Sequence, residues 1–160
     1  MNNYIMKNKI CCFTGHRNLP ADCDIEAQVT RQIYSLIHRG VDTFICGGAR
    51  GFDLLCARIL ADMKEEGEDI KIIHAIPCPG QSNSYTQYEK DIYNYVLGMS
   101  DKTVLVSDHY FSGCMHKRNR FMVDNSAYII SYCIKNSGGS FYTREYARKQ
   151  GLEVIEISDM

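Results

Sequence analysis

Two hydrophobic patterns alternate along the chain. Short runs that are apolar at nearly every position recur, and most of them precede a longer stretch in which apolar residues return every three or four positions. The short runs predict buried strands, and the longer stretches predict amphipathic helices. The predicted strands cover residues 9–13, 43–46, 71–76, 103–107, 128–133 and 154–157. The predicted helices run from near Pro20 to Gly40, over 52–64, over the later part of 81–99, over 115–125 and over 140–150.

A strand–helix–strand order that repeats predicts parallel strands joined by right-handed crossovers, with helices on both faces of the sheet. The chain has 160 residues and no linker, internal repeat or low-complexity segment, which indicates one domain. The expected fold class is therefore α/β: a single three-layer α/β/α domain over residues 1–160, with its core at about 10–157. The sheet is expected to be mainly parallel and doubly wound.

Composition narrows the function classes only slightly. The formal net charge is −1, so the overall charge favours neither nucleic acid nor membrane, although a local basic cluster can still act. No apolar run approaches the roughly 18 residues of a membrane-spanning helix, and residues 1–9 lack the apolar core of a signal peptide. We therefore expect a cytoplasmic protein with no membrane partner.

Eight cysteines are scattered along the chain without a C-x-x-C pair. We expect reduced thiols, with Cys11, Cys46 and Cys133 packed inside strands as small hydrophobic residues. Cys114 and His116 stand two residues apart, but no second pair of ligands accompanies them. Neither a metal site nor a cofactor is expected.

In a doubly wound sheet, ligands bind where the strands end at their carboxyl edge, so the loops that follow the strands indicate function. The first strand leads into Thr14, Gly15, His16 and Arg17. A glycine followed by two side chains that can carry positive charge suits an anionic ligand. The alternative is an ordinary turn with solvated charges.

The second strand leads into a G-G-x-x-G loop and an acidic residue: Gly47, Gly48, Arg50, Gly51 and Asp53. Glycines before a helix let backbone N–H groups approach a phosphate, and the helix dipole favours the anion. The spacing differs from both the dinucleotide fingerprint and the Walker A loop, and the third strand does not end in an acidic residue, which argues against NAD. Asp53 either stabilises the helix dipole or holds a ribose hydroxyl.

Two later loops repeat this chemistry. After Ser107, at the end of the fourth predicted strand, the segment 114–120 places three cations and a histidine near a helix start, where the dipole disfavours positive charge. Such a local conflict is typical of a functional site, although a solvated basic face is the alternative. The fifth strand leads to glycines and hydroxyls that suit a phosphate, or else form a flexible loop with a helix cap: Gly138, Gly139, Ser140 and Thr143.

Three motifs together, T-G-H-R at 14–17, G-G-A-R-G-F-D at 47–53 and R-N-R at 118–120, resemble the SLOG superfamily. This Rossmann-like group joins DNA-processing protein A (DprA/Smf) to the LOG-type phosphoribohydrolases. Within it the chain is most similar to the small stand-alone YpsA-like bacterial proteins, over about residues 10–157. Relatives commonly dimerise, so the resemblance implies a homodimer.

The resemblance also implies roles for particular residues. Arg118 and Asn119, together with Gly138 and Thr143, are similar to the DprA motifs, which implies binding of single-stranded DNA. M-H-x-R at 115–118 and the glycines before Glu145 are similar to the LOG side, where they serve cleavage of the N-glycosidic bond of nucleoside 5′-monophosphates. That match nominates Arg118 and Glu145 as catalytic. However, Ser137, Phe141 and Tyr142 depart from the LOG motif.

Our leading hypothesis is a pocket that binds a nucleotide or a nucleotide-derived ligand, in a sensor or an enzyme. The alternatives are a LOG-like hydrolase and a DprA-like single-strand binder, which would stack bases on Tyr110, Phe111 and Phe121. The Tyr-rich segment 81–95 either forms a lid or base-stacking wall, with Gln81 reaching the pocket, or packs on the sheet or a partner subunit.

Overall fold

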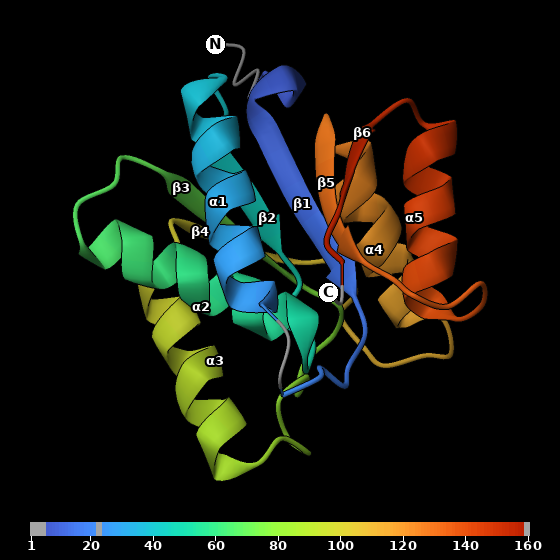
Figure 1. The fold of residues 1–160 in the computed structure, drawn as a ribbon. Coiled ribbons are helices and arrows are strands. Elements are labelled where there is room, and N and C mark those ends of the chain that lie inside the picture. Colours follow the sequence, from blue (N-terminus) through green and yellow to red (C-terminus); the bar gives the residue numbers. More distant parts are fainter. Residues whose placement is uncertain (1–5, 22–23, 159–160) are drawn as a thin grey trace, which may run out of the picture.

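Six parallel strands form one sheet in the computed structural model, which describes residues 6–21 and 24–158 (Figure 1). The strand order is β4-β3-β2-β1-β5-β6, and every neighbouring pair is parallel. The strands are β1 (Ile10–Gly15), β2 (Thr43–Cys46), β3 (Lys71–Ile76), β4 (Lys102–Leu105), β5 (Tyr128–Tyr132) and β6 (Glu153–Glu156). The predicted fold class, a Rossmann-like α/β domain with a doubly wound sheet, is confirmed.

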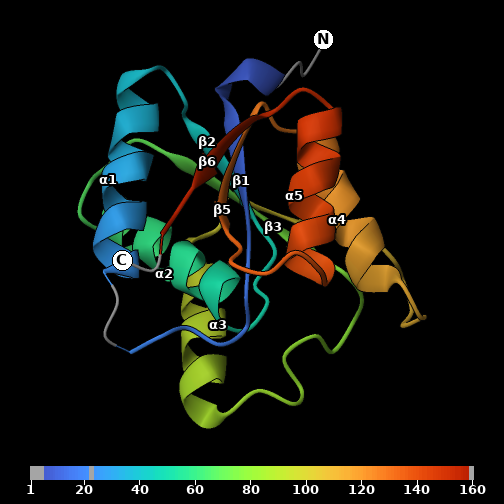
Figure 2. The same cartoon turned by 45° about the vertical axis from the view of Figure 1, so that its right-hand side comes forward.

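Helices cover both faces of this sheet (Figure 2). They are α1 (Ile25–His38), α2 (Phe52–Glu65), α3 (Gln87–Met99), α4 (Cys114–Asp124) and α5 (Gly139–Lys149), after a 3-10 turn at Lys7–Lys9. The first three helices lie on one face, and α4 and α5 lie on the other. Each face has its own core because successive side chains of a strand point to opposite sides. Phe13 thus packs with the α1–α3 side, and Cys12 packs with the α4–α5 side.

The strand order reverses between β1 and β5. The chain builds β1 to β4 in one direction and then crosses through α4 to place β5 on the other side of β1. The loops that follow β1 and β5 therefore lead to helices on opposite faces of the sheet, which leaves a crevice between the two loops. Open α/β sheets bind their ligands in such a crevice.

Several predicted element ends are wrong by a few residues. β4 ends at Leu105, so Ser107 lies in the following loop, because the pairing of β3 with β4 stops at Ile76 and the next residue is a proline without an N–H. β5 ends at Tyr132, which pairs with the last residue of β1, so Cys133 lies outside the strand.

The described cysteines are free thiols: Cys11, Cys12, Cys46, Cys56, Cys78, Cys114 and Cys133. Cys23 lies outside the described residues. No helix in the described part of the chain is long and apolar enough to cross a membrane. Within the same residues, no group of three or more His, Cys, Asp or Glu side chains is arranged to hold a metal ion.

Candidate functional site

A cavity of about 450 Å³ opens at the carboxyl edge of the sheet, over the point where the strand order reverses. Most of the predicted site residues line it: Thr14, Gly15, His16, Arg17, Arg50, Asp53, Arg118, Asn119, Gly139 and Ser140. The remaining predicted residues, Gly47, Gly48, Gly51, Ser107, Gly138, Thr143 and Glu145, are not among the lining residues. Side chains from four separate loops thus meet in one place because parallel strands bring their carboxyl ends to the same edge.

Asp53 holds the G-G-x-x-G loop in shape from the first turn of α2. Its two carboxylate oxygens accept the backbone N–H groups of Gly47 and Ala49, each at 3.2 Å. The side chain is only 6% exposed. Burial raises the pKa of the Asp53 carboxyl, while the Arg118 charge and the two N–H groups oppose that rise. These two N–H groups therefore bond a protein carboxylate, whereas the sequence pattern predicted that they would face a bound phosphate.

Arg118 is the cation that faces this carboxylate. It comes from the second turn of α4, is 3% exposed, and donates from Nη1 to the carbonyl of Gly47 at 2.5 Å and to that of Ala75 at 3.3 Å. Its Nε donates to the Asn119 side chain at 2.9 Å. Burial lowers the pKa of Arg118, and the Asp53 charge opposes this shift. The apparent conflict between a cation and the α4 dipole is thus resolved by carbonyl oxygens and a carboxylate from the facing loops.

Close contacts within the protein explain the glycines of the second loop. A Cβ at Gly47 would lie 2.5 Å from an oxygen of Asp53 and 2.7 Å from the Arg118 guanidinium. A Cβ at Gly51 would collide with the backbone carbonyl of Arg17, and one at Gly48 would collide with the His74 ring. At Gly51 the loop after β1 and the loop after β2 consequently pack backbone against backbone, with no room for a β-carbon.

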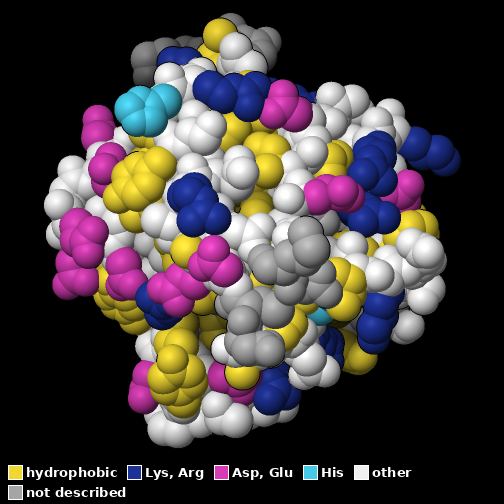
Figure 3. Space-filling view, viewed as in Figure 1, with side chains coloured by type: hydrophobic (Ala, Val, Ile, Leu, Met, Phe, Trp, Pro, Cys, Tyr) yellow, Lys and Arg dark blue, Asp and Glu magenta, His cyan; other side chains and the backbone are white. Residues whose placement is uncertain are grey.

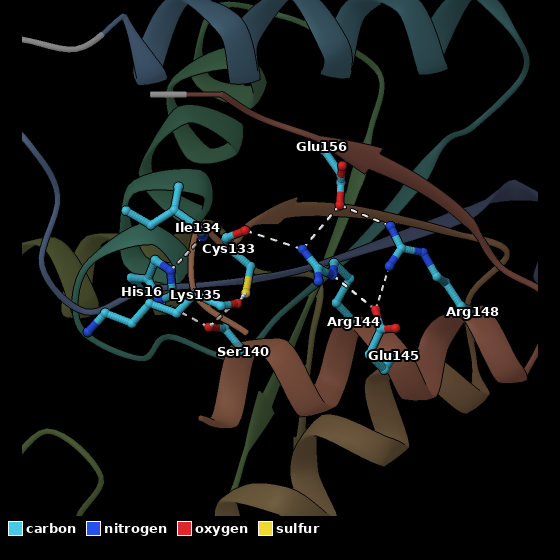
Figure 4. A network of polar contacts seen from close by, with 9 residues as sticks. All are labelled: His16, Cys133, Ile134, Lys135, Ser140, Arg144, Glu145, Arg148 and Glu156. Carbon is cyan, nitrogen blue, oxygen red and sulfur yellow. Dashed lines mark hydrogen bonds and ion pairs between the residues drawn. The ribbon is translucent and has the colours of Figure 1, made fainter. Parts of the chain in front are cut away.

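His16 and Ser140 lie together on the other side of the cavity (Figure 4). The His16 Nε2 atom accepts the backbone N–H of Ile134 at 2.9 Å, and its Nδ1 atom is 3.1 Å from the Ser140 hydroxyl. Because Nε2 is an acceptor, the neutral ring carries its proton on Nδ1 and donates it to Ser140. Burial lowers the pKa of His16, with Lys135 acting in the same direction, which also favours the neutral ring. The pair therefore joins the β1 and β5 loops and lacks the tautomer of a serine–base catalytic pair.

The first turn of α5 opens into the cavity. Gly138 and Gly139 have no heavy atom within 4 Å of the position that a Cβ would take, and no side chain caps this end of the helix. The first N–H groups of a helix have no intrahelical partner, and the positive end of the helix dipole lies beside them. Because Gly139 and Ser140 line the cavity, this helix start faces the enclosed space and suits an anion.

Thr143 and Glu145 take other positions on α5. The Thr143 hydroxyl donates to the carbonyl of Gly139 at 2.9 Å and accepts from Asn119 at 3.3 Å, which joins α5 to α4. The Glu145 carboxylate bonds Arg148 at 2.5 Å and Arg144 at 3.1 Å, in a network that continues to Glu156 (Figure 4). Among the lining residues, Asp53 supplies the carboxylate of the cavity.

The Tyr-rich segment reaches the cavity with some side chains and packs inside the protein with others. Gln81 and Tyr85 line the cavity; Gln81 donates to the carbonyl of Gly47 at 2.7 Å, and the Tyr85 hydroxyl donates to that of Gly48 at 2.9 Å. Tyr93 is buried on α3 and donates to Gln81 at 2.9 Å, so it supports this wall from behind. Sequence reasoning missed His74, which is buried beneath the loop in edge contact with Tyr93, because a lone histidine in an apolar strand carries no motif.

Buried His74 makes the stability depend on pH. Burial, with the Arg118 charge acting in the same direction, lowers the pKa of His74 to about 4, whereas the unfolded chain binds the proton near pH 6.5. The free energy of unfolding should therefore fall as the pH drops, by about 2 kcal/mol between roughly pH 6 and 4.5. Urea unfolding across this range checks the prediction, and the His74→Asn variant should show a smaller fall. If the free energy of unfolding falls equally with pH in the wild-type protein and in His74→Asn, the prediction is wrong.

Charge is unevenly distributed over the surface (Figure 3). In this view most Asp and Glu side chains lie on the side of α2, and many Lys and Arg side chains lie on the side of α5. A second, wider groove of about 1240 Å³ runs along α4 and the start of α5. Aromatic and basic side chains line it, namely Phe111, Lys117, Arg120, Phe121 and Tyr142, and it shares His116 with the first cavity.

The model of the YspA SLOG family (YpsA) matches residues 11–156. A UPF0398 protein of Bacillus velezensis is 22% identical over 129 residues, which make up 79% of this chain and 71% of the relative. A UPF0398 protein of Bacillus cereus strain B4264 is 24% identical over 130 residues, with the same shares of both chains.

Two solved structures share the fold. DNA processing protein A from Streptococcus pneumoniae superposes with a TM-score of 0.69 at 18% identity, over 96% of this chain and 52% of that protein, so the present chain spans about half of its length. The same protein from Helicobacter pylori, solved to describe its single-stranded DNA binding mode, gives a TM-score of 0.68 at 16% identity, over 96% of this chain and 67% of that one. With a family model matched over nearly its whole length and the fold of both DprA structures, the chain belongs to the YspA SLOG family.

Proposed function

We propose that the cavity at the carboxyl edge of the sheet binds a nucleotide or a nucleotide-derived ligand through its phosphate. The observation that carries the proposal is the uncapped start of α5, which opens into a cavity at the switch point of a doubly wound sheet. Backbone N–H groups at a helix start bind phosphate in many α/β proteins. A volume of about 450 Å³ falls within the range of small-molecule sites, roughly 300–1,000 Å³.

Arg17 supplies a free positive charge at the same place. It lines the cavity, and its side chain makes no hydrogen bond or ion pair with any other described residue. Arg50 also lines the cavity, but its Nε already bonds Glu89 at 2.9 Å, and Arg118 is held by backbone carbonyls. Arg17 is therefore the arginine best placed to exchange water for phosphate oxygens when a ligand binds. Gln81 and Tyr85 line the same cavity and suit the base or sugar of the ligand.

Arg17→Ala is expected to weaken binding of a nucleoside monophosphate by about 10- to 100-fold, because a hydrogen bond to a charged group contributes roughly 1.5–3 kcal/mol. The measurement is thermal stabilisation of the whole chain by nucleoside monophosphates, by the matching nucleosides and by inorganic phosphate, since a ligand that binds the native state raises the melting temperature. Arg31→Ala is the control, because Arg31 pairs with Asp24 on the exposed side of α1. Equal stabilisation by nucleosides and nucleotides, or by neither, would overturn the proposal.

A second candidate is the binding of single-stranded nucleic acid along the wider groove. The observation that favours it is the combination of Phe111 and Phe121 with Lys117 and Arg120, since single strands bind where bases stack on aromatic rings beside cations. DNA processing protein A from H. pylori, which shares the fold, binds single-stranded DNA. Thermal stabilisation by a short single-stranded oligonucleotide is therefore measured together with that by the nucleotides. Binding that survives Arg17→Ala but weakens in Arg120→Ala and with added salt would favour the groove.

A further inference from the structure

Two thiols lie against each other beside the candidate nucleotide cavity. The Cys114 thiol donates to the Cys78 sulfur at an Sγ–Sγ distance of 3.9 Å. Both residues are buried, with exposed fractions of 4% for Cys78 and 1% for Cys114. The other hydrogen bonds of cysteine side chains in the described part of the chain go to or come from oxygen atoms, at Cys11 and Cys133. Cys78 and Cys114 therefore differ from the remaining thiols in facing each other.

The two cysteines belong to separate segments that converge only in the fold. Cys78 lies in the loop after β3, between two prolines, and Cys114 is the first residue of α4, after Gly113. A disulfide has a sulfur–sulfur distance of about 2.05 Å, so the sulfur atoms would have to approach by roughly 2 Å. Irregular backbone surrounds Cys78, and no heavy atom lies within 4 Å of the position that a Cβ of Gly113 would take, so both segments can make this small approach.

We propose that Cys78 and Cys114 are a site of reversible oxidation, at which a hydroperoxide converts the two thiols into an intramolecular disulfide. One sulfur attacks the peroxide oxygen, which gives a sulfenic acid and releases water when the oxidant is hydrogen peroxide. The second sulfur then displaces the hydroxyl group, forms the S–S bond and releases a second water. The two thiols lose two electrons and two protons, and hydrogen peroxide takes up both. A small oxidant suits the site because neither sulfur is open to a bulky disulfide reagent.

The position of the pair connects this oxidation to the cavity. Cys114 and Arg118 are one turn apart on the same face of α4, and Met115, which follows Cys114, lines the cavity. Gln81, three residues after Cys78, also lines the cavity and donates to the carbonyl of Gly47, as Arg118 does. A bond that draws the two segments together therefore shifts two side chains that line the cavity and share one acceptor. The expected consequence is weaker nucleotide binding after oxidation, and this consequence alone rests on the proposed function.

The test is peptide mapping of the full chain after treatment with millimolar hydrogen peroxide. Free thiols are blocked with N-ethylmaleimide in denaturant before digestion. The expected product is a linked peptide pair containing Cys78 and Cys114, which disappears on treatment with dithiothreitol. It should be absent from Cys78→Ser and from Cys114→Ser, and present in the control Cys133→Ser, which removes a more exposed thiol. Oxidation of other cysteines without this linkage would overturn the proposal.

The thermal stabilisation of the protein by a nucleotide is measured on the same samples. This measurement distinguishes formation of the disulfide from its effect on nucleotide binding. Oxidised wild type should lose most of the thermal stabilisation by a nucleoside monophosphate that reduced wild type shows, and Cys78→Ser treated with peroxide should keep it. A mapped disulfide with unchanged stabilisation would overturn the coupling to the cavity. If reduced wild type shows no stabilisation by any nucleotide, the proposed function fails, while the mapped linkage still decides whether the pair is oxidised.

Discussion

Replacing Arg118 by methionine is expected to lower the free energy of unfolding by about 3–5 kcal/mol, because it leaves a buried carboxylate without its compensating charge. Asp53 is 6% exposed, so little solvent reaches its carboxylate to replace the guanidinium. The carbonyl of Gly47 would also lose its donor from Arg118, although Gln81 still bonds it. Urea unfolding at neutral pH measures the change.

Two further variants distinguish this explanation from a general loss of packing. Arg120→Met, two residues along the same helix, removes an exposed arginine that contacts the Tyr142 and Tyr146 rings, and it should cost about 1 kcal/mol or less. Adding Asp53→Asn to Arg118→Met should recover part of the loss, since the stranded charge is then absent. A loss below about 1 kcal/mol in Arg118→Met, or a double variant in which the two losses simply add, would contradict the explanation.

Gly51→Ala is expected to destabilise the protein more than Gly151→Ala, although both glycines have a positive φ angle. Their φ angles are +84° and +85°, so alanine is strained at both, by at least roughly 1–2 kcal/mol. The ψ angle of Gly51, −126°, lies outside the left-handed helical region, which adds to the strain there. At Gly151 the new β-carbon meets no heavy atom within 4 Å, whereas at Gly51 it collides with the backbone carbonyl of Arg17. The collision at Gly51 should lower the free energy of unfolding by roughly a further 1–3 kcal/mol, the usual cost of overpacking.

Urea unfolding of the two alanine variants checks this difference directly. The Gly51 variant should also bind a nucleoside monophosphate less well, because the residues displaced by its β-carbon, Arg17 and its neighbour His16, line the cavity. Gly151 lies between α5 and β6, far along the chain from these loops, and its variant should keep the wild-type affinity. Equal losses of stability in the two variants would contradict the prediction, because they would mean that the Arg17 loop moves away from the new β-carbon at no energetic cost.

Much of the fold could be predicted from the sequence because the central strands β1, β2, β3 and β5 are largely buried on both faces, and the helices are amphipathic. The mostly apolar run at 71–76 and the four-residue spacing of Ile25, Val29 and Ile33 are local patterns, and each matches the element that forms. The ends of elements were predicted less well. Where β4 and β5 stop depends on how far their neighbours extend, which the residues of those strands do not encode.

The candidate site, like the fold, was predicted only in part. The residue types in the four loops predicted which segments meet, and the cavity is lined by members of all of them. The roles of individual residues were predicted less well. Asp53 takes two N–H groups that seemed available to phosphate, and Glu145 is engaged with arginines at the side of α5. The homodimer, the cytoplasmic location and any catalytic role stay predictions.

The sequence by itself determined the α/β class, the family membership suggested by T-G-H-R and G-G-A-R-G-F-D, and the edge of the sheet at which the cavity lies. These follow from periodicity and from short motifs, whose information lies within a few residues. Only the tertiary structure decided which charge compensates which, that Arg118 faces Asp53 across the Gly47 loop, and that Cys78 meets Cys114. Such pairings join residues many positions apart, and they depend on how strands and crossovers stack in three dimensions. The open space beside Gly138 and Gly139 at the start of α5 was decided in the same way, because it depends on how the other segments pack around that helix.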